Sequence, residues 1–173
     1  MVTLCFLNSM SQGKNNMKIG FASDIHQLIP NRKLILAGVI VPAPFGELAR
    51  SDGDVVFHAI SEAILGALAL GDLGDHFPTS DSKYKDIDSA KLVSHVVKLM
   101  KNLGYSVGNI DVSIRLEEPK LKDYKIAMRS NIASLLNIDI SCVSVKVGTN
   151  EKMDSIGQKK AVQADAIVLL EGK

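Results

Sequence analysis

The fold of this chain depends most on residues 55–65, whose sequence is VVFHAISEAIL. The run is apolar except at three positions, and two good helix-capping types, Ser51 and Asp52, stand shortly before it. This arrangement predicts a buried helix over residues 53–70 that begins at one of those two caps. His58 lies inside this helix, where it is either a satisfied core residue or a functional group.

Strands and two further helices are predicted around this segment. Residues 110–116 alternate apolar and polar side chains, which is the period of a half-buried strand. Residues 89–103 have apolar side chains at helical spacing, and His95 is expected on the surface of that helix. The other predicted elements are strands over residues 18–26, 33–41, 142–149 and 164–170, a helix over residues 121–136, a glycine-containing C-cap and turn over residues 71–74 and a polar loop over residues 75–88.

The order of these elements indicates the fold class. Helices separated by strands, without a simple strand-helix repeat, predict an α+β sandwich with a mixed sheet and helices on one face. The other face needs a cover, and a second copy of the chain is the obvious one. With 173 residues in all, we expect one domain over residues 17–173. Residues 1–16 are interpreted as an N-terminal extension that is disordered or not native.

The composition argues against several classes of function. The net charge is +1, from 20 basic and 19 acidic side chains, so no global field favours nucleic acid or an anionic membrane. Aromatic residues make up 5% of the chain, and no run approaches the ~18 apolar residues of a membrane span. Two distant cysteines, Cys5 and Cys142, form no disulfide framework and fit a reducing compartment. Small-molecule chemistry is therefore the favoured class.

A carboxylate and two imidazoles could meet at one metal ion. Asp24 and His26 are two positions apart in the predicted strand 18–26, so their side chains point to the same side. His58, on the predicted helix, could supply a third ligand. Two neutral nitrogens and one carboxylate oxygen suit zinc, and three protein ligands leave one tetrahedral position open for substrate. The alternatives are that Asp24 ends a strand in a turn and that His58 is a core residue.

An ordered set of short motifs extends through the chain from residue 17. They are Ile19-Gly20 with Asp24-Ile25-His26, Ser51-Asp52-Gly53-Asp54 with His58-Ala59, Leu70-Gly71-Asp72-Leu73-Gly74 with Phe77-Pro78, Gly104-Tyr105 with Gly108-Asn109-Ile110-Asp111, Pro119-Lys120 with Met128-Arg129, and Lys146 with Thr149-Asn150-Glu151-Lys152. In this order the motifs resemble the family of 2-C-methyl-D-erythritol 2,4-cyclodiphosphate synthases, the cyclases of the non-mevalonate isoprenoid pathway.

The resemblance implies a homotrimer of ferredoxin-like subunits with an active site at each seam between neighbours. The implied substrate is 4-diphosphocytidyl-2-C-methyl-D-erythritol 2-phosphate, whose 2-phosphate attacks the β-phosphorus to give the 2,4-cyclodiphosphate and CMP. By the same resemblance, Asp24, His26 and His58 hold zinc, and Glu151 holds a second divalent ion, magnesium or manganese. The implied compartment is a bacterial cytoplasm or a plastid-type organelle.

The resemblance also implies roles for residues outside the zinc set. Arg50 and Thr149 would act on the phosphates as charge develops and are the expected catalytic residues. Residues 72–74 would contact the ribose, residues 77–81 would surround the methylerythritol, and residues 116–122 would enclose the cytosine. The expected substrate-binding residues are Asp24, His26, Arg50, Ser51, Asp72, Leu73, Gly74, Phe77, Pro78, Thr79, Ser80, Asp81, Leu116, Pro119, Lys120, Leu121, Lys122, Gly148, Thr149, Asn150 and Glu151.

Two places depart from the family pattern. Arg50 stands where the family usually has His, and a guanidinium can neutralise phosphate through a bidentate fork but cannot titrate as imidazole does. Within residues 154–161, Ser155 replaces a common aromatic residue and Gln158 replaces a common arginine. In relatives this stretch lines a central trimer cavity that holds an isoprenoid diphosphate in some of them, so the changes weigh against that ligand here.

Two other functions are consistent with the same residues. One is a zinc-dependent phosphohydrolase, in which bound water attacks in place of the substrate's own phosphate. The other is a non-catalytic trimeric metal-binding relative that has lost turnover through the changes at Arg50 and residues 155–161. The intact metal set, together with Thr149 and Glu151, favours the cyclase.

Overall fold

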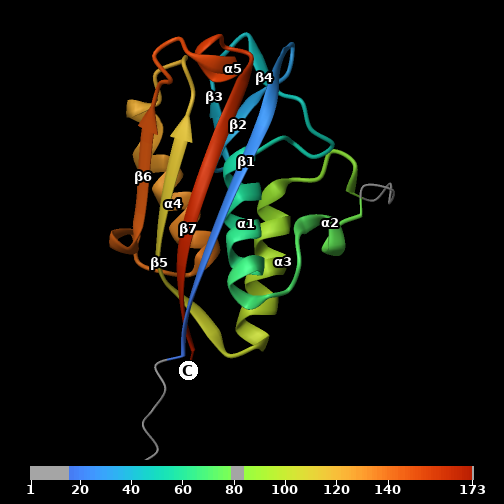
Figure 1. Ribbon diagram of the computed structural model, residues 1–173, viewed down its shortest axis with the longest axis vertical. Helices are drawn as coiled ribbons and strands as arrows, with labels where there is room; N and C mark the ends of the chain where they lie inside the picture. The colour runs from blue at the N-terminus through green and yellow to red at the C-terminus, as the bar shows by residue number, and fades with distance from the viewer. Residues whose placement is uncertain (1–15, 79–83, 173) are drawn as a thin grey trace, which may run out of the picture.

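The computed structural model describes residues 16–78 and 84–172 and shows a sheet with helices packed against one of its faces (Figure 1). Within these residues the sheet has five strands in the order β4-β1-β7-β5-β6, and β2 and β3 form a separate hairpin. The strands are β1 (Met17–Pro30), β2 (Leu34–Leu36), β3 (Val39–Val41), β4 (Phe45–Glu47), β5 (Tyr105–Arg115), β6 (Val143–Gly148) and β7 (Ala161–Gly172). The helices are α1 (Val55–Leu68), α2 (Leu73–His76), α3 (Ser89–Asn102), α4 (Lys125–Leu136) and α5 (Asp154–Gly157), with 3-10 turns η2 (Lys122–Tyr124) and η3 (Ile140–Cys142).

The sheet is mixed, as the order of elements predicted. Strand β7 pairs antiparallel with β1 on one side and with β5 on the other, whereas β5 and β6 are parallel. Parallel neighbours need a crossover connection, and α4 supplies it. The predicted α+β class, with a mixed sheet and helices on one face, is confirmed. The finer description of the subunit as ferredoxin-like stays a prediction.

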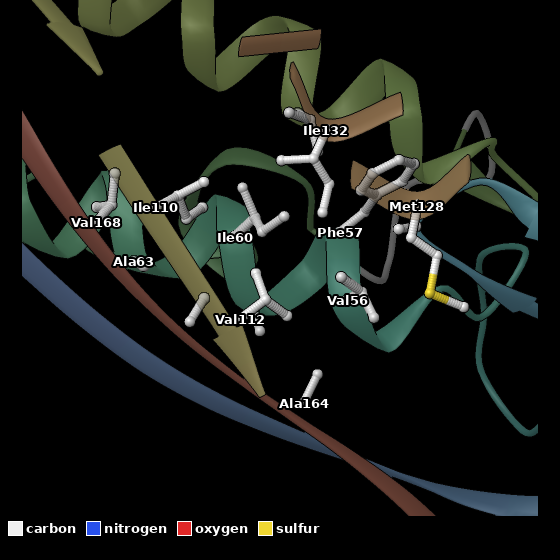
Figure 2. Close-up of a cluster of buried hydrophobic side chains, with 14 of the residues drawn as sticks. Val56, Phe57, Ile60, Ala63, Ile110, Val112, Met128, Ile132, Ala164 and Val168 are labelled. Carbon is white, nitrogen blue, oxygen red and sulfur yellow. The ribbon is translucent and has the colours of Figure 1, made fainter. Parts of the chain in front are cut away.

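The core lies between the sheet and α1. Helix α1 packs on β1 and β7, α3 packs beside α1, and α4 covers β6. Figure 2 shows Phe57 and Ile60 of α1 among Ile110 and Val112 of β5 and Ile132 of α4, and all five are buried. The apolar run of residues 55–65 is therefore a core helix, as its sequence predicted.

Two boundaries near the start of α1 differ from the prediction. The apolar run 33–41 was expected to be one strand, but it folds into the β2–β3 hairpin because Ala37 and Gly38 turn the chain with φ of 50° and 72°. The buried helix was expected to begin at Ser51 or Asp52. It begins at Val55, with Asp54 as its N-cap.

The segment after α1 also differs from the prediction. The glycines of residues 71–74 were expected to cap the helix, but α1 ends at Leu68 and its left-handed C-cap is Ala69, with φ of 55°. Part of the expected loop is helical, because Asp72 and Asp75 form a capping box that starts α2. The predicted extension of residues 1–16 lies, except for Asn16, outside the described residues.

Asp54 fixes the point at which α1 begins. Its fully buried carboxylate accepts the N–H groups of Val56 and Phe57 in the first turn of α1, both at 3.1 Å. It also accepts those of Ala37 at 2.9 Å and Gly38 at 2.6 Å, in the turn between β2 and β3. Burial raises the pKa of this carboxyl to about 6, against the opposing effect of the N–H bonds. One side chain thus joins the hairpin to the helix.

Strand β1 approaches α1 so closely that no side chain fits at Gly20. A Cβ at this position would lie 1.8 Å from the carbonyl oxygen of Ala63 and 2.9 Å from the Cβ of Ala67. Asp24 and His26 lie on the same face of β1 as Gly20, because alternate residues of a strand share a face. The close contact therefore directs both side chains toward α1.

The sheet face opposite the helices carries exposed apolar side chains. Ile19, Phe21 and Ile25 of β1 and Ile167 of β7 have between 49% and 73% of their surface exposed, and Phe21 is the register partner of Ile167. Exposed apolar groups on neighbouring strands are typical of an interaction surface. Among the described residues, no helix is both long and apolar enough to span a membrane.

Replacing Gly20 with Ala is expected to lower the free energy of unfolding by about 1–3 kcal/mol or more, because the methyl group forces β1 away from Ala63. Gly66→Ala is the matched control, since a Cβ at Gly66 in α1 meets nothing within 4 Å. Alanine is the better helix former, so this control should be as stable as the parent or more stable by about 0.5–1 kcal/mol. Denaturant titration measures both, and equal stabilities would contradict the close approach.

The raised pKa of Asp54 predicts a pH-dependent stability. Between the unfolded pKa of 3.8 and the folded pKa of about 6, the folded chain binds more protons at this carboxyl than the unfolded chain does. Stability therefore falls as pH rises through this window. Relative to Asp54→Asn, the parent should lose about 2 kcal/mol of unfolding free energy between pH 4 and pH 6.5. If the backbone N–H bonds outweigh burial and lower the folded pKa instead, the parent will lose unfolding free energy relative to Asp54→Asn as pH falls below 4.

Candidate metal centre and adjoining cavity

Strand β1 presents the first two residues of the candidate centre. Asp24 and His26 stand on the face of β1 that is directed toward α1, and both are partly buried. The Nε2 atom of His26 lies 3.2 Å from Oδ2 of Asp24. The i, i+2 prediction that these two side chains point to one side is therefore confirmed.

Helix α1 brings the third residue to the same point. His58 lies one turn after the N-cap Asp54, and its Nδ1 atom is 3.2 Å from Oδ2 of Asp24. The rings of His26 and His58 stand edge to face, with centroids 5.0 Å apart and planes at 80°. One ligand atom from each of the three residues lies within 4.8 Å of the other two. The alternatives of a turn at Asp24 and a satisfied core histidine at His58 do not describe this arrangement.

The donor set fits a small divalent ion such as zinc. Ligand bonds of about 2.0–2.1 Å in a tetrahedron place neighbouring ligand atoms about 3.3 Å apart. The carboxylate oxygen of Asp24 is 3.2 Å from a nitrogen of each imidazole. Two imidazoles and one carboxylate are also the ligand types that zinc accepts in sites with an open fourth position. Two of the three distances between ligand atoms therefore match a tetrahedral zinc site, and the third is within 4.8 Å.

The Nδ1 side of the His26 ring contacts a buried carboxyl group and a backbone carbonyl group. Its Nδ1 atom lies 2.8 Å from Oε2 of Glu47 and 2.9 Å from the carbonyl oxygen of Gly53. A carbonyl oxygen can only accept, so Nδ1 carries the proton and Nε2 is the nitrogen that faces Asp24. Gly53 has φ of +92°, and a Cβ there would lie 2.9 Å from the Cβ of Glu47, so only glycine suits this position.

Charges at the centre shift the pKa values of its groups in opposite directions. Burial raises the pKa of Asp24, but His26 and His58, when their rings are doubly protonated and therefore positive, together hold it well below its usual range. Burial lowers the pKa of His26, yet hydrogen bonds to Asp24 and Glu47 raise it to about 10. Burial raises the pKa of Glu47 to about 8, although its hydrogen bond with His26 opposes the rise. A metal ion bound at Nε2 of His26 would displace a proton from that ring.

A cavity of about 650 Å³ adjoins the three residues. It runs along the part of β1 that has no β4 partner, and it reaches α1, α2 and the start of α3. Among the described residues, its lining contains two carboxylates, from Asp24 and Glu62, and one guanidinium, from Arg50. Of the expected site residues that the structure describes, eight line it: Asp24, His26, Arg50, Ser51, His58, Leu73, Gly74 and Phe77.

A second set of expected site residues lies across the sheet from this cavity. Strand β7 separates β1 from β5, and the second set follows the ends of β5 and β6 (Figure 1). Among the described residues that line the cavity, none belongs to this set. Its members are Leu116, Pro119, Lys120, Leu121, Lys122, Gly148, Thr149, Asn150 and Glu151.

The second set has an organised structure of its own. The Thr149 hydroxyl donates to Oε1 of Glu151 at 2.7 Å, and both residues are exposed. The backbone N–H of Leu116 donates to the carbonyl oxygen of Gly148 at 3.1 Å, which joins the ends of β5 and β6. Leu116 and Leu121 are buried in the core, so these two offer backbone groups rather than side chains to a ligand.

The remaining expected residues fall near α2. Asp72 is the N-cap of α2 and is exposed, and Pro78 is exposed but does not line the cavity. Thr79, Ser80 and Asp81 lie outside the described residues. His95, expected on the surface of its helix, is exposed there, with its ring 5.2 Å from that of Phe77.

Several residues of the site were not predicted from the sequence. Glu62 lines the cavity, accepts the N–H of Leu73 at 3.0 Å and follows His58 by one helical turn, a spacing that could have revealed it. Burial raises the pKa of its carboxyl. Glu47 and Ser89 come from β4 and the start of α3, and no local pattern links either residue to His26 or His58. Tyr84 lines the cavity as well.

The arrangement agrees with comparisons to known proteins. A family model described as the YgbB family matches residues 17–171. The chain belongs to the YgbB family. The 2-C-methyl-D-erythritol 2,4-cyclodiphosphate synthase of Chlorobaculum parvum is 50% identical over 157 residues, which cover 91% of this chain and 100% of that protein. The protein of the same name from Brachyspira hyodysenteriae is 47% identical over 155 residues, which cover 90% of this chain and 98% of that one.

Solved structures of similar proteins share the fold. The bifunctional IspDF of Campylobacter jejuni superimposes with a TM-score of 0.88 at 38% identity, over 92% of this chain and 43% of that chain. The Plasmodium falciparum IspF, solved as a CDP complex, superimposes with a TM-score of 0.81 at 35% identity, over 92% of this chain and 98% of that one. The resemblance recognised from the sequence motifs is confirmed.

Replacing His58 with Ala should abolish tight binding of zinc. The loss removes a direct ligand, so it should exceed the about 10- to 100-fold decrease in affinity that is typical when an outer partner of a ligand is removed. Competition with a chromophoric chelator measures the affinity. His95→Ala is the control, because His95 is exposed on α3 and lies outside the candidate metal set. Unchanged zinc affinity in His58→Ala would contradict the assignment.

Proposed function

We propose that this chain is a 2-C-methyl-D-erythritol 2,4-cyclodiphosphate synthase, a lyase of isoprenoid precursor synthesis. The observation that carries the proposal is a three-residue metal centre beside a large cavity, in a chain about half identical to synthases of that name over nearly its full length. Membership of the YgbB family over residues 17–171 supports the same reaction.

The substrate in this proposal is 4-diphosphocytidyl-2-C-methyl-D-erythritol 2-phosphate. An oxygen of its 2-phosphate attacks the β-phosphorus and forms a new P–O–P bond. The bond from the β-phosphorus to the bridging oxygen breaks, and CMP leaves with that oxygen. Because both reacting groups belong to one molecule, the protein must chiefly fold the substrate back on itself and neutralise its charge. The CDP complex of the Plasmodium falciparum relative supports a cytidine nucleotide as ligand.

The walls of the cavity suit the two ends of such a molecule. Leu73 and Phe77 offer apolar surface for the carbon skeleton. Arg50 is exposed at the cavity and can pair with a phosphate through its guanidinium fork. The carboxylates in the described part of the lining, Asp24 and Glu62, add negative charge, and the one guanidinium there cannot balance three phosphate groups. The proposed site therefore needs cations from outside this lining.

Metal ions and basic residues of the second set would supply that charge. Zinc held by Asp24, His26 and His58 would act as a Lewis acid on a phosphate oxygen and fix its position. Glu151 would hold a second divalent ion, magnesium or manganese, close to the diphosphate. Lys120 and Lys122 are both exposed and lie in the same set as Glu151.

We infer that a neighbouring copy of the chain brings the second set to the cavity. The cavity lies along the free edge of β1, whereas the second set follows the strands at the opposite edge of the sheet. When opposite edges of identical subunits meet head to tail, the contacts form a ring if the rotation between neighbours closes, and an open filament if it does not. The exposed apolar side chains of β1 and β7 would then be buried inside that ring. A homotrimer is the ring that the family resemblance implies.

The reaction itself is the first test. With zinc and magnesium, the protein should convert the diphosphocytidyl substrate to equimolar CMP and cyclodiphosphate, measured by phosphorus-31 NMR. In water enriched in oxygen-18 the product should contain no label, because the nucleophile is the substrate's own phosphate. Labelled product would identify a phosphohydrolase instead. Release of no CMP would overturn the proposal in favour of a non-catalytic metal-binding protein.

Arg50 provides a test of charge neutralisation in the cavity. Arg50→Ala should lower kcat/KM by about 10²–10³, because one charge partner of the phosphates is lost. Arg50→His should recover part of this rate and make it depend on pH near the pKa of a histidine, about 6.5. Steady-state kinetics measure both variants. An unchanged rate in Arg50→Ala would remove this residue from the proposed mechanism.

Mixed assemblies test whether the site is shared between subunits. His58→Ala lacks one half of the proposed site and Glu151→Gln lacks the other, so each variant alone should be inactive. When the two are unfolded and refolded together in equal amounts, each mixed trimer has one junction with both intact halves, which restores about a quarter of the parent activity. A site contained in one subunit would stay inactive in every mixture.

A further inference from the structure

The ring of His58 has different partners on its two nitrogens. Nδ1 lies 3.2 Å from Oδ2 of Asp24, on the side of the candidate metal site. Nε2 points the other way and lies 3.0 Å from the hydroxyl of Ser51 and 3.1 Å from that of Ser89. A neutral imidazole carries one proton, so it can bind a cation through Nδ1 only when that proton is on Nε2.

Asp24 by itself would favour a ring proton on Nδ1 of His58, the nitrogen that must be free to bind the metal. Its carboxylate oxygen is an acceptor beside Nδ1 of His58. In the absence of an opposing partner, that acceptor draws the ring proton to Nδ1, where it blocks the lone pair that a metal ion needs. A group that accepts the proton at Nε2 would keep the ring in its ligating form.

The hydroxyl of Ser89 can act only as an acceptor toward His58. Its single proton is donated to Oδ1 of Asp52, at 2.5 Å. The oxygen of Ser89 therefore presents a lone pair to Nε2, and Nε2 must supply the proton of that hydrogen bond. Ser51 does not decide the matter, because its hydroxyl proton remains free to point either way while its oxygen accepts the N–H of Gly53 at 3.1 Å.

Backbone contacts hold Asp52 and Ser89 in this geometry. The second carboxylate oxygen of Asp52 accepts the backbone N–H of Ser89 at 3.1 Å, and the N–H of Asp52 donates to the carbonyl oxygen of Ile87 at 3.0 Å. Ser89 is fully buried at the first position of α3. The carboxylate and the hydroxyl therefore have little freedom to exchange donor and acceptor roles.

We propose that Asp52 and Ser89 are positioning residues, which keep the proton of His58 on Nε2 and its Nδ1 lone pair toward the metal. The inference rests on the proposed function for the identity of the metal site, and on the hydrogen bonds above for the role of the two residues. His26 has the opposite arrangement, because its proton is on Nδ1 against the carbonyl oxygen of Gly53. Two separate supports thus aim different nitrogens of the two rings at one point.

The tautomer of His58 tests the inference without zinc. In chelator-treated parent protein at mildly alkaline pH, nitrogen-15 NMR should show a protonated Nε2 and an unprotonated Nδ1. Ser89→Ala removes the acceptor, so the proton should move toward Nδ1, beside Asp24. Ser94→Ala is the matched control, because Ser94 is on the same helix and donates to the carbonyl oxygen of Ala90 without contacting His58. A proton on Nδ1 in the parent would overturn the inference.

Zinc affinity gives the second readout. Ser89→Ala should bind zinc about 10-fold more weakly, within the range known for outer partners of metal ligands, while Ser94→Ala binds as the parent does. Equal affinities in Ser89→Ala and the parent would overturn the positioning role. A parent protein that binds no zinc would contradict the proposed function, while the tautomer measurement would still judge the inference.

A double-mutant cycle tests the part assigned to Asp52. If Asp52 acts through Ser89, then Asp52→Asn combined with Ser89→Ala should weaken zinc binding no more than Ser89→Ala does alone. Additive losses would show that Asp52 acts on the site by another route and would overturn its role. Asp52→Asn alone should weaken zinc binding in the same direction, and it provides the test if Ser89→Ala does not fold.

Discussion

The site depends on the contact between β1 and α1. At Gly20 the two elements meet backbone to backbone, since a Cβ there would lie 1.8 Å from the carbonyl oxygen of Ala63. Further along the same two elements, Oδ2 of Asp24 in the strand lies 3.2 Å from Nδ1 of His58 in the helix. A larger residue at Gly20 would separate strand and helix, and the carboxylate and the imidazole would separate with them. The packing of the core and the geometry of the candidate metal centre therefore both depend on one contact.

Local sequence patterns correctly predicted the features that depend on a single helix or strand. The strand period placed Asp24 and His26 on one face, and the apolar run of residues 55–65 predicted the core helix. The same patterns did not find where that helix begins, because Ser51, Asp52 and Asp54 are all good N-cap types. The structure selects Asp54 because its carboxylate also accepts N–H groups from the β2–β3 turn. That turn was not predicted either, because it lies within the apolar run 33–41, which favoured one continuous strand.

The candidate site shows the same division between local and distant information. The three candidate metal ligands and the residues of the YgbB motifs could be identified from the sequence. Glu47 and Ser89 could not, because they reach His26 and His58 from elements that are adjacent only in the folded chain. The site shared between subunits was implied by the family resemblance alone and stays a proposal. No local pattern states which edges of the sheet would meet, and the structure places the cavity and the second set on separate parts of one chain.

The buried acids around the start of α1 are costly for stability, and their positions explain why they are tolerated. Burial raises the pKa of Glu47 to about 8, and the Oε1 atom of its carboxyl has no partner among the described residues. Its other oxygen joins His26 of β1 to the N–H of Val55, the first residue of α1. Asp54 holds the next two N–H groups of the same helix. The first turn of α1 is thus fixed from two sides, and His58 follows it directly. Carboxyl groups are rarely buried, yet two are buried at this one helix start, which leads to both histidines. Their clustering is more consistent with the demands of a preorganised site than with those of stability.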